Sequence, residues 1–388
     1  MIGFINGKII GEDKVLEGSV LLVEDGRIVE IAPERGNLAG TELIDVSGAY
    51  IAPGFIDIHS DYCEQLIQPR ATAIMDLDMA FAQVERILAA QGVTTVFHSL
   101  SLQNPTLQKV KEVRNLEFVA KIAEKIHKEQ KDAGLIRHRL HLRIELDNPA
   151  CCDTVAEWID KGYIHEISFM DHTPGQGQYR NLEIYKKSTM AYMDMESDAV
   201  YDAWMEKQAA KPMISAKQME TLIIKAQELG IAAASHDDDT TEKIDFLKSM
   251  RVTISEFPIT PEVAKRAAEN GIYTVFGAPN VLLGGSHSGN LSAAEVVTQM
   301  VGGILCSDYY PAGLLYSVFI LNRTHHMPLP ACFALTSLNP AKALRIEKDY
   351  GSLAAGKKAD FLIIKDGEPP CITEVYTDGR AVLRYRNR

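Results

Sequence analysis

The chain has 388 residues, of which 46% are hydrophobic, and its formal net charge at pH 7 is −12. This length is too great for one small domain and fits a barrel of ordinary size with a smaller companion. The acidic balance argues against broad binding of nucleic acid or of anionic membranes, because both need a basic surface. An anionic small molecule stays open as a substrate, since a metal ion and a few local cations can reverse the field of one site.

A β-hairpin is predicted close to the start of the chain. The apolar stretches 19–23 and 27–31 lie on either side of Asp25 and Gly26. An Asp-Gly pair supplies the positive φ angles that a tight hairpin turn requires. Ahead of this hairpin, residues 1–8 lack the basic segment and the long apolar run of a signal peptide or a membrane span.

The middle of the chain alternates apolar, strand-like runs with helical stretches. Eight buried parallel strands separated by helices predict an α/β fold of the TIM-type (β/α)8 barrel class. A doubly wound open sheet is the alternative, but no Gly-x-Gly-x-x-Gly motif follows a strand. The eight runs are Tyr50–Ile58, Val93–His98, Arg139–Leu146, Ile164–Met170, Ile231–Ala234, Val252–Phe257, Ile272–Phe276 and Gly303–Cys306.

The helical stretches carry signals for their ends. Lys109–Gly134 places apolar residues on one stripe and ends at a glycine, a common C-cap, and Pro261–Gly271 begins with a proline that suits a first helical turn. The polar segment 179–212, with a helix expected over 198–210, is too long for a simple connection. It is interpreted either as a lid over the barrel mouth or as a solvated excursion or subunit contact.

Polar side chains follow the apolar runs, at the strand ends that face the active site of such a barrel. His59 and Asp61 are two residues apart, so an extended chain puts an imidazole and a carboxylate on one side, where both can bind one divalent ion. This pair alone is as readily a hydrogen-bonded strand end. Five strand ends that carry histidine or acid favour a metal site. The candidate ligands are His59, Asp61, Glu145, His172, His236 and Asp308.

Three further features bear on this site. His141, Arg143 and Glu145 alternate along one strand, so they share a face, and a salt bridge from Arg143 to a neighbouring carboxylate is an alternative to a metal role for this row. The consecutive aspartates 237–239 would repel one another unless a cation or a helix N-terminus lies near them. The glycine-rich segment 277–290, after the seventh strand, predicts either an anion-binding loop or a flexible turn.

A second hairpin is predicted at the end of the chain, where Asp378 and Gly379 lie between two short apolar stretches. Because short strands occur at both termini, we expect one small β-sandwich domain built from residues 1–52 and 345–388. The catalytic barrel is then expected over residues 53–344. Two separate β-appendages are the alternative.

The cysteines indicate the compartment. None of the six forms a Cys-x-x-Cys pair, and Cys151 and Cys152 are adjacent, a poor arrangement for an ordinary disulfide. We interpret them as reduced thiols of a cytoplasmic protein. We expect further copies of the chain as partners, in a homo-oligomer, and neither nucleic acid nor membrane.

Several of these segments resemble the amidohydrolase superfamily. The resemblance rests on strands at both termini, on residues 52–57 leading into a histidine motif, and on the closing segment 351–360, and it covers nearly the whole chain. That superfamily usually carries His-x-His on its first strand, whereas this chain has His59-Ser60-Asp61. The departure puts a routine amidase assignment in doubt.

This departure fits one branch of that superfamily, which several segments of the chain resemble closely: the diphosphatases of phosphonate utilisation in the carbon–phosphorus lyase pathway. The resemblance implies a small phosphorylated sugar as the partner, namely hydrolysis of α-D-ribose 1-methylphosphonate 5-triphosphate to the 5-phosphate and diphosphate. Pro69-Arg70-Ala71 stands where that branch has Pro-Arg-Pro, which could adjust the choice of substrate. The matching segments are 138–146, 170–176, 235–238, 277–280, 284–290 and 307–312.

From this resemblance we expect metal-assisted hydrolysis, with the six candidate ligands holding one or two divalent ions, zinc being the expected metal. The ion lowers the pKa of a water towards about 7, and Asp308, itself among the ligands, also orients that water and accepts its proton. Residues expected to bind the phosphate chain are Arg70, Lys217, Gly284, Gly285, Ser286 and His287.

Two rival hypotheses stay open. A conventional amidohydrolase that opens a cyclic amide or deaminates a base would need the same metals but no triphosphate pocket. A non-catalytic barrel, kept as a binding or scaffold subunit, would need neither, and the intact series of strand-end ligands argues against it. The products formed and the metal bound after purification separate these possibilities.

Overall fold

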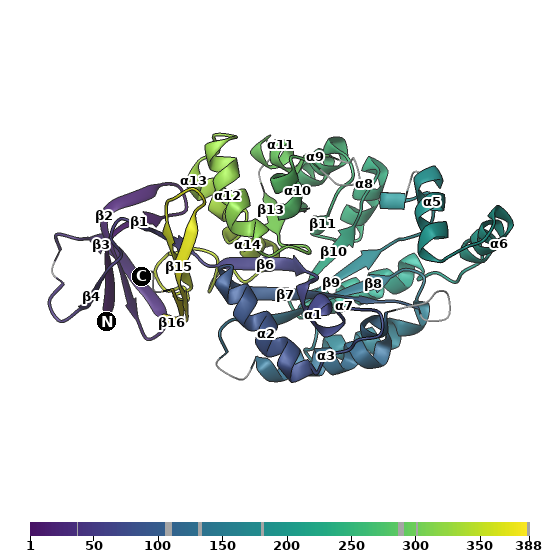
Figure 1. Cartoon of the computed structure of the whole chain (residues 1–388), viewed down its shortest axis with the longest axis horizontal. Helices are drawn as coiled ribbons and strands as arrows, with labels where there is room; N and C mark the ends of the chain where they lie inside the picture. Colours follow the sequence, from purple (N-terminus) through teal and green to yellow (C-terminus); the bar gives the residue numbers. More distant parts are fainter. Residues whose placement is uncertain are drawn as a thin grey trace.

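The structure, a computed structural model, describes residues 1–36, 38–104, 111–130, 134–179, 182–285, 291–299 and 302–385. Two eight-stranded sheets organise these residues. One is a mixed sheet made by both ends of the chain, and the other is a parallel sheet made by the middle (Figure 1). The prediction of a (β/α)8 barrel with a small β-domain is therefore confirmed.

The mixed sheet joins the two chain ends through β5 (Tyr50–Pro53) and β14 (Phe361–Lys365), which pair antiparallel. Phe4, Phe361 and Tyr376 fill its core, with ring centroids 4.3 Å apart for the stacked pair Phe361–Tyr376. The two termini thus form one sheet in place of two appendages. Its other strands are β1 (Ile2–Ile10), β2 (Val15–Glu24), β3 (Arg27–Pro33), β4 (Glu42–Asp45), β15 (Cys371–Thr377) and β16 (Arg380–Arg384).

Both predicted hairpin turns are present, and they lie side by side. Asp25 and Gly26 have φ angles of 48° and 76°, and Asp378 and Gly379 have 48° and 70°. Residue Ala359 ties them together, since its N–H donates to the carbonyl of Gly26 at 2.9 Å and its carbonyl accepts from the N–H of Gly379 at 2.8 Å. A turn from each end of the chain is thus held against the same residue.

The parallel sheet is nearly closed into a barrel. Its strands follow chain order from β6 to β13, and the two outer strands meet where the N–H of Asp61 donates to the carbonyl of Asp308 at 2.8 Å and the N–H of Asp308 donates to His59 at 3.0 Å. The strands are β6 (Phe55–Ser60), β7 (Val93–Leu102), β8 (Arg137–Glu145), β9 (Glu166–Met170), β10 (Ala232–His236), β11 (Ile254–Glu256), β12 (Tyr273–Gly277) and β13 (Gly303–Cys306).

Amphipathic helices cover the outside of the barrel (Figure 1). In α3 the apolar stripe from Phe118 to Ile126 is buried, and the Asn115 side chain accepts from the N–H of Phe118, a cap worth about 1 kcal/mol. The helices are α1 (Tyr62–Ile67), α2 (Leu77–Ala90), α3 (Leu116–Glu129), α4 (Cys152–Asp160), α7 (Ala216–Glu228), α8 (Thr241–Ser249), α9 (Pro261–Glu269), α10 (Ala278–Leu283), α11 (Ala293–Gln299), α12 (Gly313–Arg323), α13 (Leu329–Ala334) and α14 (Leu338–Ala343).

Two predicted boundaries are wrong. The helix expected to end at Gly134 ends at Glu129, with Gln130 as its C-cap. The expected loop after β12 begins instead with α10, for which Pro279 lies in the first turn and Gly284, at φ 73°, is the left-handed C-cap. Proline and glycine therefore mark the ends of a short helix at this place. The expected helix 261–271 is confirmed as α9.

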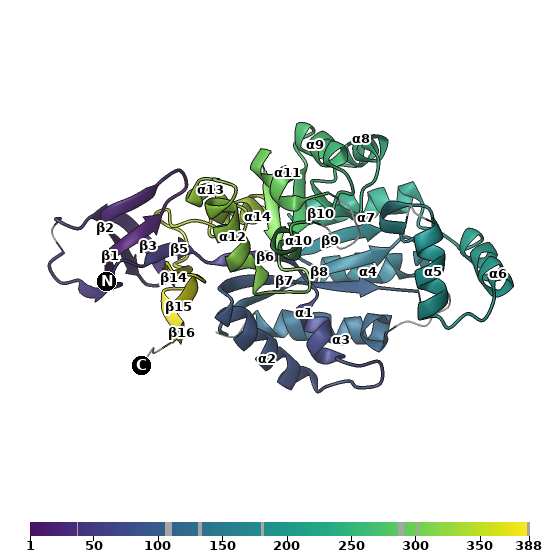
Figure 2. The same cartoon turned by 45° about the horizontal axis from the view of Figure 1, so that its top comes forward.

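The polar segment after β9 forms α5 (Leu182–Tyr192) and α6 (Asp198–Ala209), so the expected helix near 198–210 is confirmed. Both helices lie at the end of the barrel opposite the small β-domain (Figures 1 and 2). The ring of Tyr179, just before α5, lies 5.6 Å from that of His172. A lid role stays a prediction. Within the ranges described above, every helix is too short or too polar to cross a bilayer.

Candidate active site

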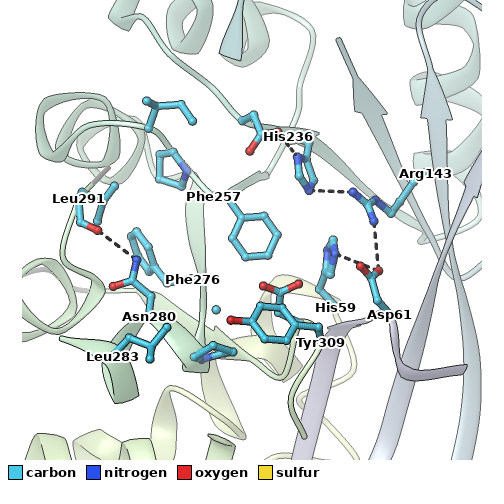
Figure 3. A pocket seen from close by; sticks show the side chains of 16 residues that line it. His59, Asp61, Arg143, His236, Phe257, Phe276, Asn280, Leu283, Leu291 and Tyr309 are labelled. Atoms are coloured by element: carbon cyan, nitrogen blue, oxygen red, sulfur yellow. Dashed lines mark hydrogen bonds and ion pairs between the residues drawn. The ribbon is translucent and has the colours of Figure 1, made fainter. Parts of the chain in front are cut away.

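A cavity of about 310 Å³ opens at the carboxyl ends of the barrel strands, within the size range of small-molecule sites (Figure 3). His59, Asp61, Arg143 and His236 gather on one side of it, whereas Asn280 lies on the other side, beside Leu283 and Leu291 (Figure 3). The polar side chains are His59, Asp61, Arg143, His236, Asp237, Asn280 and Asp308. The apolar wall includes Phe257, Phe276, Leu283, Leu291 and Tyr309.

Three strands end in the same backbone conformation at this cavity. Asp237, Phe257 and Asp308 follow β10, β11 and β13 closely, and their φ angles are 51°, 53° and 56°. Each still donates its N–H to a neighbouring strand, with N···O distances of 2.8, 2.9 and 3.0 Å. A positive φ costs a bulky residue such as phenylalanine roughly 1–2 kcal/mol. Strain of this kind gathers at functional sites, so it supports a function for this mouth.

His59, Asp61 and Asp308 meet where the first and last strands close the barrel. The Nε2 atom of His59 lies 3.8 Å from Oδ1 of Asp61, and one ligand atom of each of the three residues lies within 4.8 Å of the others. Burial, with repulsion from the carboxylate of Asp61, raises the pKa of Asp308 to about 7. Two acids and an imidazole are thus crowded together, an arrangement that a cation would relieve.

Glu256, at the end of β11, fixes the orientation of His59. Its Oε1 atom lies 2.6 Å from Nδ1 of His59, and both side chains are almost completely buried. Burial, followed by the charge of Arg143, holds the pKa of His59 well below its usual range, so the ring is neutral. Nδ1–H then donates to Glu256, and the Nε2 lone pair faces Asp61. A carboxylate that orients a histidine in this way is typical of metal ligands.

Arg143, on β8, lies between the two sides of the polar wall (Figure 3). Its Nη1 donates to Oδ1 of Asp61 at 3.1 Å, and its Nη2 donates to Nε2 of His236 at 3.2 Å. The residue is only 8% exposed. The salt bridge that the sequence left open is therefore present, and it links two candidate metal ligands.

Glu145 and His172 form a separate pair. Both carboxylate oxygens of Glu145 lie close to Nδ1 of His172, at 2.8 and 3.0 Å. Burial alone would lower the pKa of His172, but the charge and hydrogen bond of Glu145 outweigh it and raise that pKa. The structure therefore brings His59, Asp61, His236 and Asp308 into the cavity and places Glu145 against His172, as the partner of its Nδ1.

The donor set of the cavity fits a divalent ion. An imidazole nitrogen and two carboxylates form a cluster of the kind that binds zinc, with His236 beside it. Among the described residues that line the cavity, Arg143 is the one lysine or arginine, against the carboxylates of Asp61, Asp237 and Asp308. The surplus of negative charge is what a bound cation would balance.

The sequence pattern of the Amidohydrolase family matches residues 50–382, from the last strand of the N-terminal segment to the final hairpin. The chain belongs to this family. It is 32% identical over 361 residues to the alpha-D-ribose 1-methylphosphonate 5-triphosphate diphosphatase of Escherichia coli K12, a match covering 92% of this chain and 93% of that protein. It is 23% identical to an imidazolonepropionase of Desulfotalea psychrophila, over 98% of this chain and 94% of that one.

Solved structures agree on the fold of this amidohydrolase. The N-acetylglucosamine-6-phosphate deacetylase of Pasteurella multocida superimposes with a TM-score of 0.66 at 14% identity, covering 98% of this chain and 99% of that one. The 5-methylcytosine deaminase of Klebsiella pneumoniae, liganded with 5-fluorocytosine, gives 0.66 at 15% identity, covering 100% and 98%. At these identities the likeness concerns the barrel and its companion sheet.

The residues expected to bind phosphate in the amidohydrolase lie in several places. Arg70 is exposed between α1 and α2, and Lys217 is exposed in the first turn of α7; neither lines the cavity. The N–H groups of Gly284 and Gly285 donate to the carbonyls of Val281 and Asn280 at the end of α10. These two backbone amides therefore donate to carbonyls of the same helix, whereas the sequence prediction had them donate to an anion. Ser286 and His287 lie outside the described residues.

Asp237 and Asp238, in the run of aspartates 237–239, have side-chain partners within the protein. Asp238 accepts from the hydroxyl of Ser235 at 2.6 Å and lies 2.9 Å from the ammonium of Lys243. Oδ2 of Asp237 lies 3.0 Å from Nδ1 of His236. Of the two explanations that the sequence offered, a cation is present for Asp238, where Lys243 of α8 supplies it, and the aspartates also precede the N-terminus of α8 directly.

Two groups near the site escaped sequence analysis. Glu256 is the last residue of a three-residue strand, which is too short for an alternating pattern to single it out. Arg114 follows β7, and its guanidinium is 2.8 Å from Oε2 of Glu64. Burial alone would lower the pKa of Arg114, but the charges of Glu64, Asp61 and Glu145 outweigh it and raise that pKa. A basic segment after the second strand was the signal that could have found it.

Proposed function

We propose that this amidohydrolase hydrolyses the phosphoanhydride of α-D-ribose 1-methylphosphonate 5-triphosphate, giving the 5-phosphate and diphosphate in phosphonate catabolism. The observation that carries the proposal is the 32% identity, over nine-tenths of both chains, to the E. coli protein that bears the name of this diphosphatase. The convergence of His59, Asp61, His236 and Asp308 supports a hydrolytic site of that kind.

His59, Asp61 and Asp308 would hold a divalent ion, and His236 is placed to join them. Zinc is the proposed metal, because imidazole and carboxylate ligands suit it. A second ion, if bound, would take the free nitrogen of His172, whose other nitrogen is fixed by Glu145. When bound, such an ion lowers the pKa of a water and neutralises charge on phosphoryl oxygens.

Asp308 is the proposed proton acceptor. Its side chain borders the cavity, and its pKa of about 7 lies near the pH at which a general base works best. In the proposed step, a water oxygen forms a bond to the α-phosphorus and passes its proton to Asp308. The bond from the α-phosphorus to the bridging oxygen breaks, and diphosphate leaves with that oxygen.

Arg143 and Arg114 are the proposed contacts of the phosphate chain. Arg143 already borders the cavity, and its guanidinium can move from Asp61 to a phosphoryl oxygen in a bidentate contact. Arg114 is fixed by its ion pair with Glu64, and its pKa is raised by Glu64 and then by the charges of Asp61 and Glu145. Arg70, Lys217, Ser286 and His287 remain proposed for the distal phosphates.

The apolar wall favours a second candidate. Phe257, Phe276 and Leu283 present a surface suited to a ring rather than to charged phosphates. A conventional amidohydrolase that opens a cyclic amide or deaminates a base would use such a wall. The more distant relatives, an imidazolonepropionase and adenine deaminases at 23% identity, are of this type by name.

Product analysis tests the two candidates directly. The zinc-loaded protein is incubated with the ribosyl triphosphate, with and without chelator, and the products are followed by phosphorus NMR. We expect signals of diphosphate and of a 5-phosphate monoester, both abolished by the chelator. Release of ammonia or of a ring-opened acid from cyclic amide substrates, with the triphosphate intact, would favour the second candidate.

Partners and compartment belong to the same proposal. A phosphorylated sugar of a catabolic pathway is found in the cytoplasm, and all six cysteines are free thiols in the structure, as suits a reducing compartment. We propose a cytoplasmic homo-oligomer that binds neither nucleic acid nor membrane. Sedimentation of the purified protein measures the number of subunits.

A further inference from the structure

Three titratable side chains meet inside the barrel, deeper than the cavity, and the proposed reaction uses none of them directly. His141 and Glu166 are register partners on β8 and β9, four residues before the ends of these strands, and Glu256 faces them from β11. All three residues are 0% exposed. One ligand atom of each lies within 4.8 Å of the others.

The histidine of this cluster presents a lone pair to an acid. Nδ1 of His141 lies 3.2 Å from the backbone carbonyl of Ile58 and 3.2 Å from Oγ of Ser99, and Oε2 of Glu166 approaches the same nitrogen to 3.8 Å. Because the carbonyl can only accept, we assign the hydrogen to Nδ1. Nε2 is then an acceptor in the neutral ring. It faces Oε2 of Glu256 at 3.5 Å, and the other oxygen of that carboxylate is engaged by His59.

The cluster lacks donors. Within the described part of the chain, Nε2 of His141, Oε2 of Glu256 and both oxygens of Glu166 have no hydrogen-bond partner. Buried acceptors of this kind are rare, because each costs about 1–3 kcal/mol when it is left unpaired. Three such groups pointing at one another indicate that something positive lies between them.

The spacing between His141 and Glu256 fits a shared metal ion better than a hydrogen bond between these two side chains. Ligand atoms of one tetrahedral zinc, each roughly 2.0–2.2 Å from the ion, lie about 3.3–3.6 Å apart, which matches the 3.5 Å between His141 and Glu256. A charge-assisted hydrogen bond would draw those atoms to about 2.7–2.9 Å. The N–H of His141 bound to a backbone carbonyl is also the usual outer contact of a metal-bound histidine.

We propose that His141, Glu166 and Glu256 bind a divalent transition-metal ion, zinc being the best match, inside the barrel beneath the proposed active site. The ion fixes Glu256, and Glu256 in turn orients His59 at the mouth, so the deep site supports the cavity from below. This site does not depend on which substrate the mouth accepts.

Metal content and anomalous diffraction test the proposal. The wild type is produced with zinc in the medium, and bound zinc is counted by plasma mass spectrometry. Glu166→Gln keeps the shape of the side chain and removes its charge, so we expect it to hold about one zinc fewer per chain. The matched control is Ser168→Ala, a buried position two residues further along β9, which should keep the wild-type count.

Crystals of the wild type, measured at the zinc edge, should show an anomalous peak between the three side chains that is missing in Glu166→Gln. A wild-type map without this peak overturns the proposal and indicates a neutral acid at Glu166. Equal zinc content in the wild type and in Glu166→Gln overturns it as well. Neither measurement uses substrate, so failure of the proposed reaction would leave this result unaffected.

Discussion

Two arginines of strand β8 lie at opposite ends of the barrel and meet opposite surroundings. Arg137, at the start of the strand, contacts Asp360 and lies 2.7 Å from Asp378, which Lys358 also approaches to 3.0 Å. The two positive side chains, Arg137 and Lys358, therefore balance the two carboxylates at this end. Arg143, near the end of the strand, faces a cavity whose described lining holds three aspartates and no other lysine or arginine.

The difference separates a structural cluster from a functional one. At the start of the strand, the barrel meets the small β-domain, and paired charges hold the two together. At the carboxyl end, acids and imidazoles are crowded without enough positive charge, and the backbone is strained at Asp237, Phe257 and Asp308. Backbone strain and crowded charges of this kind lower stability, and they are found in proteins mainly where they serve binding or catalysis.

The largest expected effect is at the mouth. Asp308→Asn keeps an oxygen that can bind the ion but removes the proton acceptor, so kcat should fall by about 10²–10⁴-fold while zinc content stays near that of the wild type. Turnover of the ribosyl triphosphate and metal analysis check both statements. Tyr309→Phe, a neighbour in the cavity, is the control and should keep near wild-type turnover. Full activity of Asp308→Asn would contradict the role given to this residue.

The second effect should appear at the opposite end of β8. Arg137→Ala leaves Asp360, which is 7% exposed, and Asp378 without this partner, so the free energy of unfolding should fall by roughly 3 kcal/mol. Urea unfolding measures it, and kcat of the folded fraction should not change. Arg143→Ala should show the reverse pattern, with a small change in stability and a large loss of turnover. Equal losses of stability in the two variants would contradict the division into a structural role for Arg137 and a functional role for Arg143.

The strands and their ends were the predictable part of this protein. Seven of the eight apolar runs each correspond to one barrel strand, because a parallel strand buried on both faces leaves a strong pattern. The run Tyr50–Ile58 is instead divided between β5 of the mixed sheet and β6 of the barrel. His59, Asp61, His236 and Asp308 could be found as polar residues directly after such runs. The hairpins were predictable from their Asp-Gly turns alone.

What escaped prediction depends on contacts between distant residues. Glu256 and His59 are 197 residues apart, and nothing local in a three-residue strand shows that they touch. Glu145 was expected among the ligands, and its contact with Nδ1 of His172 could not be predicted, because it depends on the relative positions of β8 and β9. The short helix α10 was missed because proline and glycine mark helix ends as well as loops.

The third prediction concerns the junction at the structural end. Gly26 has φ 76°, and a Cβ there would lie 3.0 Å from the carbonyl oxygen of Asp378 in the facing turn. Gly26→Ala should therefore lower the free energy of unfolding by about 2 kcal/mol, from backbone strain and from this contact.

Gly18→Ala is the matched control for that prediction. Gly18 has φ 62° but meets nothing within 4 Å, so its substitution should cost about 1 kcal/mol of strain alone. Urea unfolding of both variants isolates the contact between the two hairpins. Equal losses would show that the two turns do not support each other.

The smallest expected effect is a pH dependence that belongs to the barrel wall rather than to either end. His98, on β7, is completely buried, and its Nε2 atom lies 2.9 Å from Nδ1 of His138. Burial, with the nearby charge of His138, holds the pKa of His98 well below 6.5, so the folded protein keeps it neutral. The unfolded chain takes up a proton there below about pH 6.5, so stability falls as the pH falls through that value.

For this residue alone, the loss between pH 8 and pH 5.5 should be about 1.4 kcal/mol. His98→Gln removes the titrating group, so its free energy of unfolding should fall less over that interval than that of the wild type, by about this amount. Urea unfolding at both pH values gives the two differences. The zinc count of His98→Gln should stay at the wild-type value, because His98 contacts the barrel wall and not the cavity. Loss of zinc from His98→Gln would instead indicate that His98 supports the metal site, which would contradict its assignment to the barrel wall.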